Sequence, residues 1–249
     1  MKRIIIVLLC FINIQVYAQT LRIAVAANAQ FVIKTLQADF KQKTGIVTEV
    51  VIGSSGKLTA QIKNGAPYDF FLSADMEFPE NLFKSGQGLT KPKEYAAGSL
   101  IVCSTSQNVK NWKSLVASNT IHKIAIGNPS LAPYGLAAEQ ALKHDQLWEK
   151  VKSKLVFAES ISQVNIYLTT GNVALGFTSE SLIYEYKGKN KLNWFRIDPS
   201  TYDRIRQGMI VLSYAKKGNF AKAMKFYNYL SSASAQKILQ NNGYQVPKS

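Results

Sequence analysis

Cysteine and histidine are scarce in this chain, with two of each in 249 residues. They leave little material for a disulfide framework or for a zinc site of Cys and His ligands. The 15 glycines and 7 prolines are too few for a collagen-like or low-complexity chain. The hydrophobic fraction of 47% is sufficient for a globular core, which excludes a disordered chain.

Long apolar runs are absent except at the start of the chain. Met1-Lys2-Arg3 precedes an apolar run from Ile4 to Ile14, and the small residue Ala18 follows. The pattern predicts a secretory signal peptide over residues 1–18, with a retained anchor as the alternative. The run is shorter than the roughly 20 residues that span a bilayer. We therefore expect a periplasmic protein whose only cysteine is Cys103.

Acidic residues are few, with 15 Asp and Glu against 30 Lys and Arg, giving a formal charge of +15. Loss of Lys2 and Arg3 with the signal peptide lowers this charge by two. A solvated basic surface can raise the rate of encounter with anions, or favour an acidic membrane or partner. The sequence has no recognition motif, basic helix or aromatic-interleaved basic run, so we expect no nucleic-acid partner.

Catalytic signatures are also missing. No His-Glu-x-x-His is present, and Gly53-Ser54-Ser55-Gly56 lacks the spacing of a Gly-x-Ser-x-Gly nucleophile elbow. Asp69 and Asp75 could form an acid/base pair, but we interpret Asp69 as the start of a strand and Asp75 as a helix cap. We expect no enzyme and no cofactor.

Short β-rich runs alternate with helical patterns, which is typical of a parallel sheet covered by helices. The strand candidates exceed what one small sheet needs, so we predict two α/β lobes with a ligand cleft between them. Lobe 1 is expected over 19–98 and 208–249, and lobe 2 over 99–207. A single larger doubly wound domain is the alternative. The expected strands are 21–26, 47–52, 70–72, 100–103, 124–126, 155–157, 173–177 and 210–214. The expected helices are one capped by Asn28 and ending at Gly45, one carrying Leu58 and Ile62, and 135–143, 163–170, 220–230 and 233–239.

Small polar residues occupy four turns that lead into predicted helices. A helix N-terminus offers unpaired N–H donors and a partial positive charge, so it attracts anions. Asn and Ser are also ordinary helix caps, so each turn taken singly has a structural explanation as well. The four turns are Ala26-Ala27-Asn28, Gly53-Ser54-Ser55-Gly56, Pro133-Tyr134-Gly135 and Ser160-Ile161-Ser162.

Four sequence blocks carry a family resemblance. They read GSSGKL at 53–58, GAPYD at 65–69, FLSAD at 71–75 and APYG at 132–135. In order and spacing the chain resembles the periplasmic molybdate-binding proteins of ABC importers over essentially its whole mature length. The resemblance implies a type II periplasmic-binding-protein fold, with two α/β lobes, a two-strand hinge and one oxyanion between the lobes. It also implies a monomer that captures molybdate, and tungstate, for an inner-membrane ABC permease.

Residues are assigned to the anion by the matching motifs. The resemblance implies side-chain contacts from Asn28 and Ser55 and backbone N–H contacts from Tyr134 and Val164. Molybdenum would be held only as its oxyanion, without direct protein–metal ligands. Additional candidates are Ala27, Ser54 and Ser179, the last standing where some members have a Tyr hydroxyl.

Uncharged donors suit such a ligand because a fully deprotonated tetrahedral oxyanion presents only acceptors. Each hydrogen bond to a charged group contributes roughly 1.5–3 kcal/mol. Hydrogen phosphate brings a proton that needs a buried acceptor, so it should bind poorly to a site made only of donors. Sulfate and thiosulfate share the chemistry of molybdate, and a carrier of such an anion is the alternative function.

Overall fold

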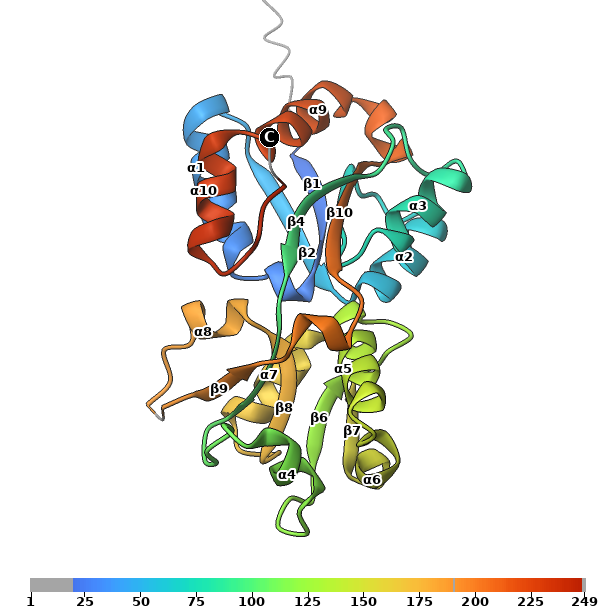
Figure 1. Ribbon diagram of the computed structural model, residues 1–249. Helices are drawn as coiled ribbons and strands as arrows, with labels where there is room; N and C mark the ends of the chain where they lie inside the picture. Colours follow the sequence, from blue (N-terminus) through green and yellow to red (C-terminus); the bar gives the residue numbers. More distant parts are fainter. Residues whose placement is uncertain (1–19, 190, 248–249) are drawn as a thin grey trace, which may run out of the picture.

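The computed structural model describes residues 20–189 and 191–247, and it shows two lobes, each built on a five-stranded sheet (Figure 1). The signal peptide predicted for residues 1–18 lies outside this range. Within the described range, no helix combines the length and apolar character that a membrane span requires.

Lobe 1 contains the sheet with strand order β2-β1-β3-β10-β4. The strands β1, β2 and β3 are parallel, whereas β10 is antiparallel to both of its neighbours. The strands are β1 (Leu21–Ala26), β2 (Thr48–Gly53), β3 (Phe70–Leu72), β4 (Lys93–Gly98) and β10 (Ile205–Val211). The helices are α1 (Val32–Thr44), α2 (Ser55–Lys63), α3 (Glu77–Lys84), α9 (Phe220–Tyr229) and α10 (Ala233–Asn241), with 3₁₀ turns η1 (Ala27–Ala29) and η4 (Ser213–Lys217).

Lobe 2 contains the sheet with strand order β7-β6-β8-β5-β9. Here β6 is parallel to β7 and β8, and β5 is antiparallel to β8 and β9. The strands are β5 (Leu100–Ser104), β6 (Ile124–Gly127), β7 (Leu155–Ala158), β8 (Leu175–Ser179) and β9 (Asn193–Arg196). The helices are α4 (Trp112–Ala117), α5 (Pro133–His144), α6 (Trp148–Val151), α7 (Ile161–Thr169) and α8 (Ser181–Glu185), with 3₁₀ turns η2 (Lys152–Lys154) and η3 (Pro199–Thr201).

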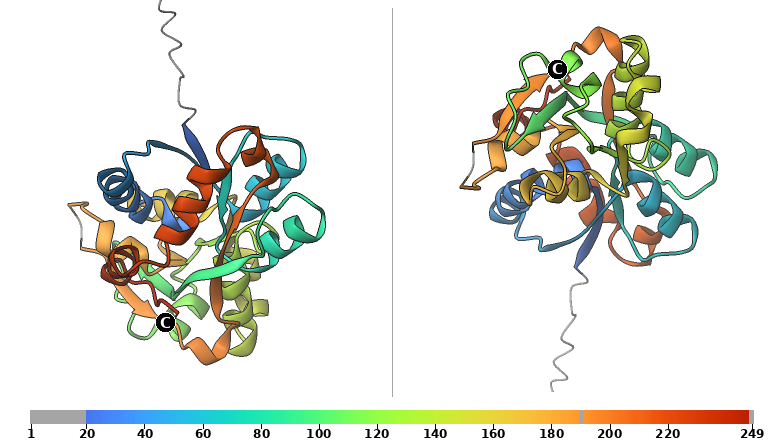
Figure 2. Two further views of the ribbon diagram at one scale, coloured as in Figure 1. Left: turned by 90° about the horizontal axis from the view of Figure 1, so that it is seen from above. Right: turned by 90° about the horizontal axis from the view of Figure 1, so that it is seen from below.

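Both faces of the lobe 1 sheet are covered by helices. In Figures 1 and 2, α1 and α10 lie on one side of this sheet and α2 and α3 on the other. Because strand side chains alternate between faces, Ile23 and Val25 pack into one apolar cluster while Ala24 packs into the other. A strand buried on both faces reads as a continuous apolar run, which explains why the sequence identified β1 so well.

The chain crosses between the lobes twice. It leaves lobe 1 where β4 ends at Gly98 and re-enters where β10 begins at Ile205. Because the returning strand runs opposite to the departing one, β10 pairs antiparallel with β4, with Ile205 opposite Gly98. The parallel arrangement that the alternating pattern predicted holds for β1, β2 and β3 and for β6, β7 and β8, whereas β10 and β5 are antiparallel to their neighbours. The predicted boundary after residue 207 also differs, since 205–207 already belong to the lobe 1 sheet.

The region around Asn28 differs from the prediction as well. Asn28 lies inside η1, and α1 begins four residues later at Val32, without a side-chain hydrogen bond at its N-cap Phe31. The prediction that Asn28 caps this helix is therefore wrong, and the Asn28 side chain is available for other contacts. Ser54 does act as an N-cap, because its hydroxyl accepts from the N–H of Lys57.

Helix α5 is held very close to β6 in lobe 2. A Cβ added at Gly135 would lie 2.0 Å from the carbonyl oxygen of Gly127. Such a distance requires the backbone to move, so Gly135→Ala should reduce the free energy of unfolding by about 3 kcal/mol. The measurement is chemical denaturation, with Leu136→Ala as control.

Leu136 is the next residue along α5 and is partly exposed, so its replacement should change stability by only about 0.5 kcal/mol. Equal stability of Gly135→Ala and the unsubstituted protein would contradict the close packing of α5 on β6.

Candidate functional site

The four small polar turns meet where the two lobes touch. The N–H of Gly56, in the first turn of α2, donates to the carbonyl of Leu131, just before α5, at 3.0 Å. The hydroxyl of Ser162, in α7, donates to the Gln30 side chain, which follows η1. All four turns, two from each lobe, thus face one another across the same interface, as an anion site shared by the lobes requires.

Ser55 is the first residue of α2 and is 1% exposed. Its hydroxyl oxygen accepts a hydrogen bond from the N–H of Ala74 at 2.9 Å, which fixes the oxygen in place. A hydroxyl has one proton to donate, and accepting from Ala74 does not use it. Ser55 therefore offers one oriented O–H donor at the N-terminus of a helix, where the partial positive charge also favours an anion.

Asn28 is 3% exposed and has several partners. Its amide Nδ2 lies 3.0 Å from Oε1 of Gln207 and 3.4 Å from the hydroxyl of Tyr244. Its backbone carbonyl accepts from Tyr244 at 2.8 Å and from Ser181 at 2.9 Å. Its Oδ1 is buried and has no hydrogen-bond partner. One end of this carboxamide is thus held by the protein, and the other is unused.

Tyr134 and Val164 occupy different positions in their helices. Tyr134 is the second residue of α5, where a backbone N–H has no partner within the helix. Val164 is the fourth residue of α7, and its N–H donates to the carbonyl of Ser160 at 3.2 Å. The free N–H groups of α7 are expected one turn earlier, at Ile161 and Ser162. The backbone of Tyr134 can therefore serve an anion directly, and the role of Val164 stays a prediction.

The additional anion-binding candidates, Ala27, Ser54 and Ser179, make contacts within the protein. The hydroxyl of Ser179 lies 2.8 Å from that of Ser181, which in turn donates to the carbonyl of Asn28. Ser54 caps α2, and Ala27 is buried in the apolar cluster that joins the lobes. Ser181 was not predicted from the sequence, although it connects lobe 2 to Asn28 directly.

Three further residues around Asn28 were also missed. Gln207, in β10, accepts from the hydroxyl of Tyr95 at 2.8 Å, and its Nε2 donates to the hydroxyl of Tyr134 at 3.0 Å. Tyr244 is placed by the C-terminal segment, which pairs with β4 through Ala97. Burial raises the pKa of Tyr95 and of Tyr134, and it raises the pKa of Tyr244 to about 12, so all three remain neutral phenols at physiological pH.

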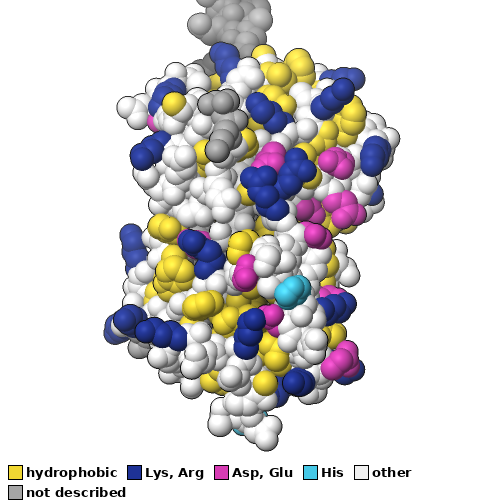
Figure 3. Space-filling model, viewed as in Figure 1, with side chains coloured by type: hydrophobic (Ala, Val, Ile, Leu, Met, Phe, Trp, Pro, Cys, Tyr) yellow, Lys and Arg dark blue, Asp and Glu magenta, His cyan; other side chains and the backbone are white. Residues whose placement is uncertain are grey.

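The charges near the interface are paired. The carboxylate of Glu180, next to Ser179, is buried and accepts from the guanidinium of Arg196 through two nitrogens, one at 2.8 Å. Lys57 forms a 2.6 Å ion pair with Glu159 across the rim of a groove of about 390 Å³ between the lobes. On the face shown in Figure 3, Lys and Arg are spread over both lobes. The residues of the four turns themselves, 26–28, 53–56, 133–135 and 160–162, are uncharged.

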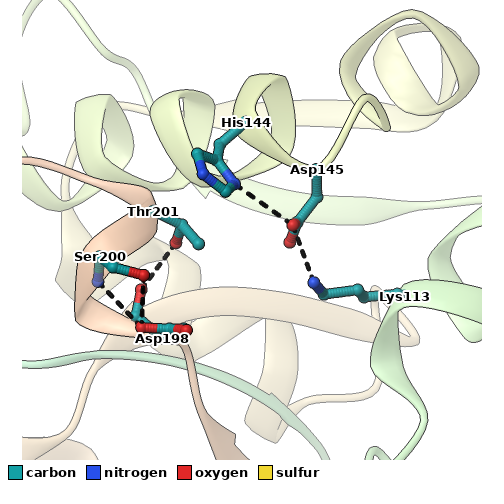
Figure 4. Close-up of polar contacts among 6 residues, drawn as sticks. All are labelled: Lys113, His144, Asp145, Asp198, Ser200 and Thr201. Carbon is teal, nitrogen blue, oxygen red and sulfur yellow. Dashed lines mark hydrogen bonds and ion pairs between the residues drawn. The ribbon is translucent and has the colours of Figure 1, made fainter.

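Uncharged donors at helix N-termini can bind a small anion. Over residues 20–189 and 191–247, no three His, Cys, Asp or Glu side chains come together as metal ligands. Figure 4 shows the histidine of α5, His144, which lies beside Asp145 on lobe 2. The neighbouring Ser200 hydroxyl donates to Asp198 at 2.8 Å. Ser200 is therefore not hydrogen-bonded as the nucleophile of a Ser-His-Asp triad.

Asp75 belongs to the loop that positions Ser55. It accepts hydrogen bonds from the hydroxyl of Ser73 at 3.0 Å and from the N–H of Phe78, in the first turn of α3, at 3.1 Å. Asp75 thus accepts from the first turn of α3, as predicted, although the N-cap position itself is Met76. Burial raises the pKa of Asp75 to about 6, despite these hydrogen bonds. The folded state therefore binds the Asp75 proton more tightly than the unfolded state does.

The raised pKa of Asp75 predicts a pH dependence of stability. Between pH 4 and 6 the unfolded state loses this proton first, so the free energy of unfolding falls by about 2–3 kcal/mol and the loss persists above pH 6. Asp75→Asn keeps a neutral acceptor for Phe78, so it should remove this dependence and be the more stable protein at pH 7. Denaturation curves of both proteins from pH 4 to 8 test this, and parallel pH profiles would contradict it.

Comparison with known proteins adds independent information. Residues 21–245 match the family of bacterial extracellular solute-binding proteins. The molybdate-binding protein ModA of Azotobacter vinelandii is 33% identical over 91% of this chain and 90% of its own length. ModA of Rhodobacter capsulatus is 32% identical over 89% of this chain and 86% of its own length. The solved structure of the A. vinelandii periplasmic molybdate-binding protein superposes with a TM-score of 0.85, covering 92% of this chain and all of that one. The two-lobed fold that the sequence resemblance implied is thereby confirmed.

Proposed function

Because this chain belongs to the bacterial extracellular solute-binding proteins, we propose that it captures molybdate in the periplasm and delivers it to an ABC permease. Proteins of this family bind solutes and are not enzymes, which agrees with the absence of catalytic motifs from the sequence. The observation that supports the proposal is that uncharged turns at the starts of helices from the two lobes contact each other across the interface. Tungstate has the same charge and shape and is proposed as a second ligand.

The donor set fits an anion that has no proton. The backbone N–H of Tyr134 can only donate, and the hydroxyl of Ser55, whose oxygen already accepts from Ala74, offers its proton to such a ligand. A protonated oxyanion needs an acceptor for its own hydrogen, and leaving that hydrogen unpaired in a buried site costs about 1–3 kcal/mol. Molybdate, tungstate and sulfate at neutral pH have no such hydrogen, whereas hydrogen phosphate has one.

Delivery to a permease requires the site to open. Lobe 1 supplies Asn28 and Ser55 and lobe 2 supplies Tyr134, so closure completes the donor set and opening divides it. The anion stabilises the closed state because it binds that state better than the open one. We propose that a permease recognises the closed, loaded form and separates the lobes to release the anion.

A melting-temperature panel with molybdate, tungstate, sulfate and phosphate tests the proposed ligand. A ligand at a hundredfold excess over its Kd adds about 2.7 kcal/mol to the free energy of unfolding. Molybdate and tungstate should raise the melting temperature most, and phosphate should have little effect. Stabilisation by phosphate equal to that by molybdate would contradict the proposal. Preference for sulfate would favour the alternative carrier.

Ser55→Ala tests the assignment of the site. Loss of a hydrogen bond to a charged ligand should weaken molybdate binding about 10- to 100-fold in calorimetry. The free energy of unfolding should fall by about 1–3 kcal/mol, because the buried N–H of Ala74 loses its acceptor. The matched control is Ser232→Ala, which removes the N-cap of α10 and should lower stability by about 1 kcal/mol without affecting binding. Molybdate binding that survives Ser55→Ala combined with Asn28→Ala would show that the site is elsewhere.

A further inference from the structure

The side chain of Asn28 ends in a carboxamide, whose NH₂ group donates hydrogen bonds and whose oxygen accepts them, although the two groups have nearly the same shape. The end held by Gln207 and Tyr244 is Nδ2, and the buried, unpartnered end is Oδ1. If that free end met an anion, two acceptors would face each other without a proton between them. For Asn28 to donate to the anion, its carboxamide must turn by 180° about its last bond, which places Nδ2 where Oδ1 was.

Gln207 decides whether that turn is possible. Its side chain is fully buried and contacts three polar groups. Its Oε1 lies 3.0 Å from the Asn28 amide and 2.8 Å from the Tyr95 hydroxyl, and its Nε2 lies 3.0 Å from the Tyr134 hydroxyl. When Asn28 turns, its Oδ1 would face Oε1 of Gln207, which is again a pair of acceptors.

Turning both carboxamides together removes this conflict. Nε2 of Gln207 then donates one hydrogen to Asn28 Oδ1 and the other to the Tyr95 hydroxyl, at the same heavy-atom distances. Oε1 of Gln207 accepts from the Tyr134 hydroxyl, which can rotate its proton toward it because burial keeps this phenol protonated. Asn28 Nδ2 is then the free end, and its hydrogens are available to the anion.

We propose that Gln207 is a positioning residue that holds the carboxamide of Asn28 with its NH₂ group toward the bound anion. This inference rests on the proposed function, because it takes Asn28 as an anion ligand. Gln207 suits the role because a carboxamide can either accept from Asn28 or donate to it, depending on its own orientation. Tyr134 comes from lobe 2, so the same hydrogen-bond chain ties Asn28 to the lobe that supplies the opposite donors.

Two substitutions at Gln207 separate this role from packing. Gln207→Glu has nearly the same shape but can only accept while ionised, so it keeps the Asn28 NH₂ group turned away from the anion. Gln207→Met fills the space without dictating an orientation, so Asn28 remains free to turn. By calorimetry with sodium molybdate, Gln207→Glu should bind about 100-fold more weakly than the unsubstituted protein, and Gln207→Met about 10-fold more weakly.

The negative charge introduced by Gln207→Glu also repels an anion, so both substitutions are repeated with Asn28→Ser. A hydroxyl can donate in any rotamer and does not need Gln207 to orient it. The difference in molybdate affinity between Gln207→Glu and Gln207→Met should therefore be much smaller in the Asn28→Ser protein. If that difference in affinity is the same in the Asn28→Ser protein, the charge of Glu alone explains the effect and the proposal is overturned. The proposal is also overturned if Gln207→Glu binds molybdate as tightly as the unsubstituted protein.

A spectroscopic measurement reports on the orientation directly. The side-chain ¹⁵N–¹H signals of Asn28 are identified by their absence in Asn28→Ser. They should shift on addition of molybdate in the unsubstituted protein and in Gln207→Met, and stay unshifted in Gln207→Glu at saturating molybdate. Unshifted Asn28 signals in the saturated unsubstituted protein would overturn the positioning role alone. If that protein binds no molybdate in the same titration, the proposed function fails, and the role of Gln207 fails with it.

Discussion

A small dianion leaves water only if the protein replaces every hydrogen bond that it loses. Water supplies donors from all directions, so a binding site must collect donors from several chain segments and hold them in place beforehand. In the site proposed for this chain, the donors come from turns at the starts of helices that belong to two separate lobes. The arrangement of the two sheets, the hinge strands and the loops around Asn28 and Ser55 all serve to bring those turns together.

The donors are themselves held by a second layer of contacts. The Ser55 hydroxyl accepts from the N–H of Ala74, and the loop that contains Ala74 is held in place by the hydrogen bonds of Asp75. Asn28 is fixed by Gln207 from a hinge strand and by Tyr244 from the C-terminal segment. In the proposed site the Ser55 hydroxyl is already oriented and loses little entropy when the ligand arrives. The Asn28 carboxamide is held by the same layer with its Oδ1 free, so it has to turn before it donates.

A site without charged side chains attracts anions less strongly but selects among them better. Lysine or arginine would attract any anion strongly, including phosphate, whereas uncharged donors discriminate by the presence or absence of a proton on the ligand. The nearby carboxylate of Glu180 is compensated by Arg196, so it does not oppose an anion at the interface. The overall positive charge acts at a distance, where salt screens it over about 8 Å.

The sequence predicted the long apolar strands and the helices with clear periodicity, such as β1 and α9, because these patterns are local. It missed β4, whose Tyr-Ala-Ala-Gly segment has little strand character, and the short edge strand β9. It also expected Asn28 to cap a helix. The polar residues around Asn28 could not be predicted, because Gln207 and Tyr244 lie 179 and 216 positions away along the chain. Only the folded chain shows them together.

The central claim is that uncharged groups from both lobes enclose the anion, and a crystal structure of the protein with molybdate tests it most directly. Anomalous scattering locates molybdenum without reference to the surrounding density. We expect a single site between the first turns of α2 and α5, within hydrogen-bond distance of the Ser55 hydroxyl and the Tyr134 N–H. Molybdate held by a lysine or arginine, or bound outside the interface between the lobes, would contradict the account.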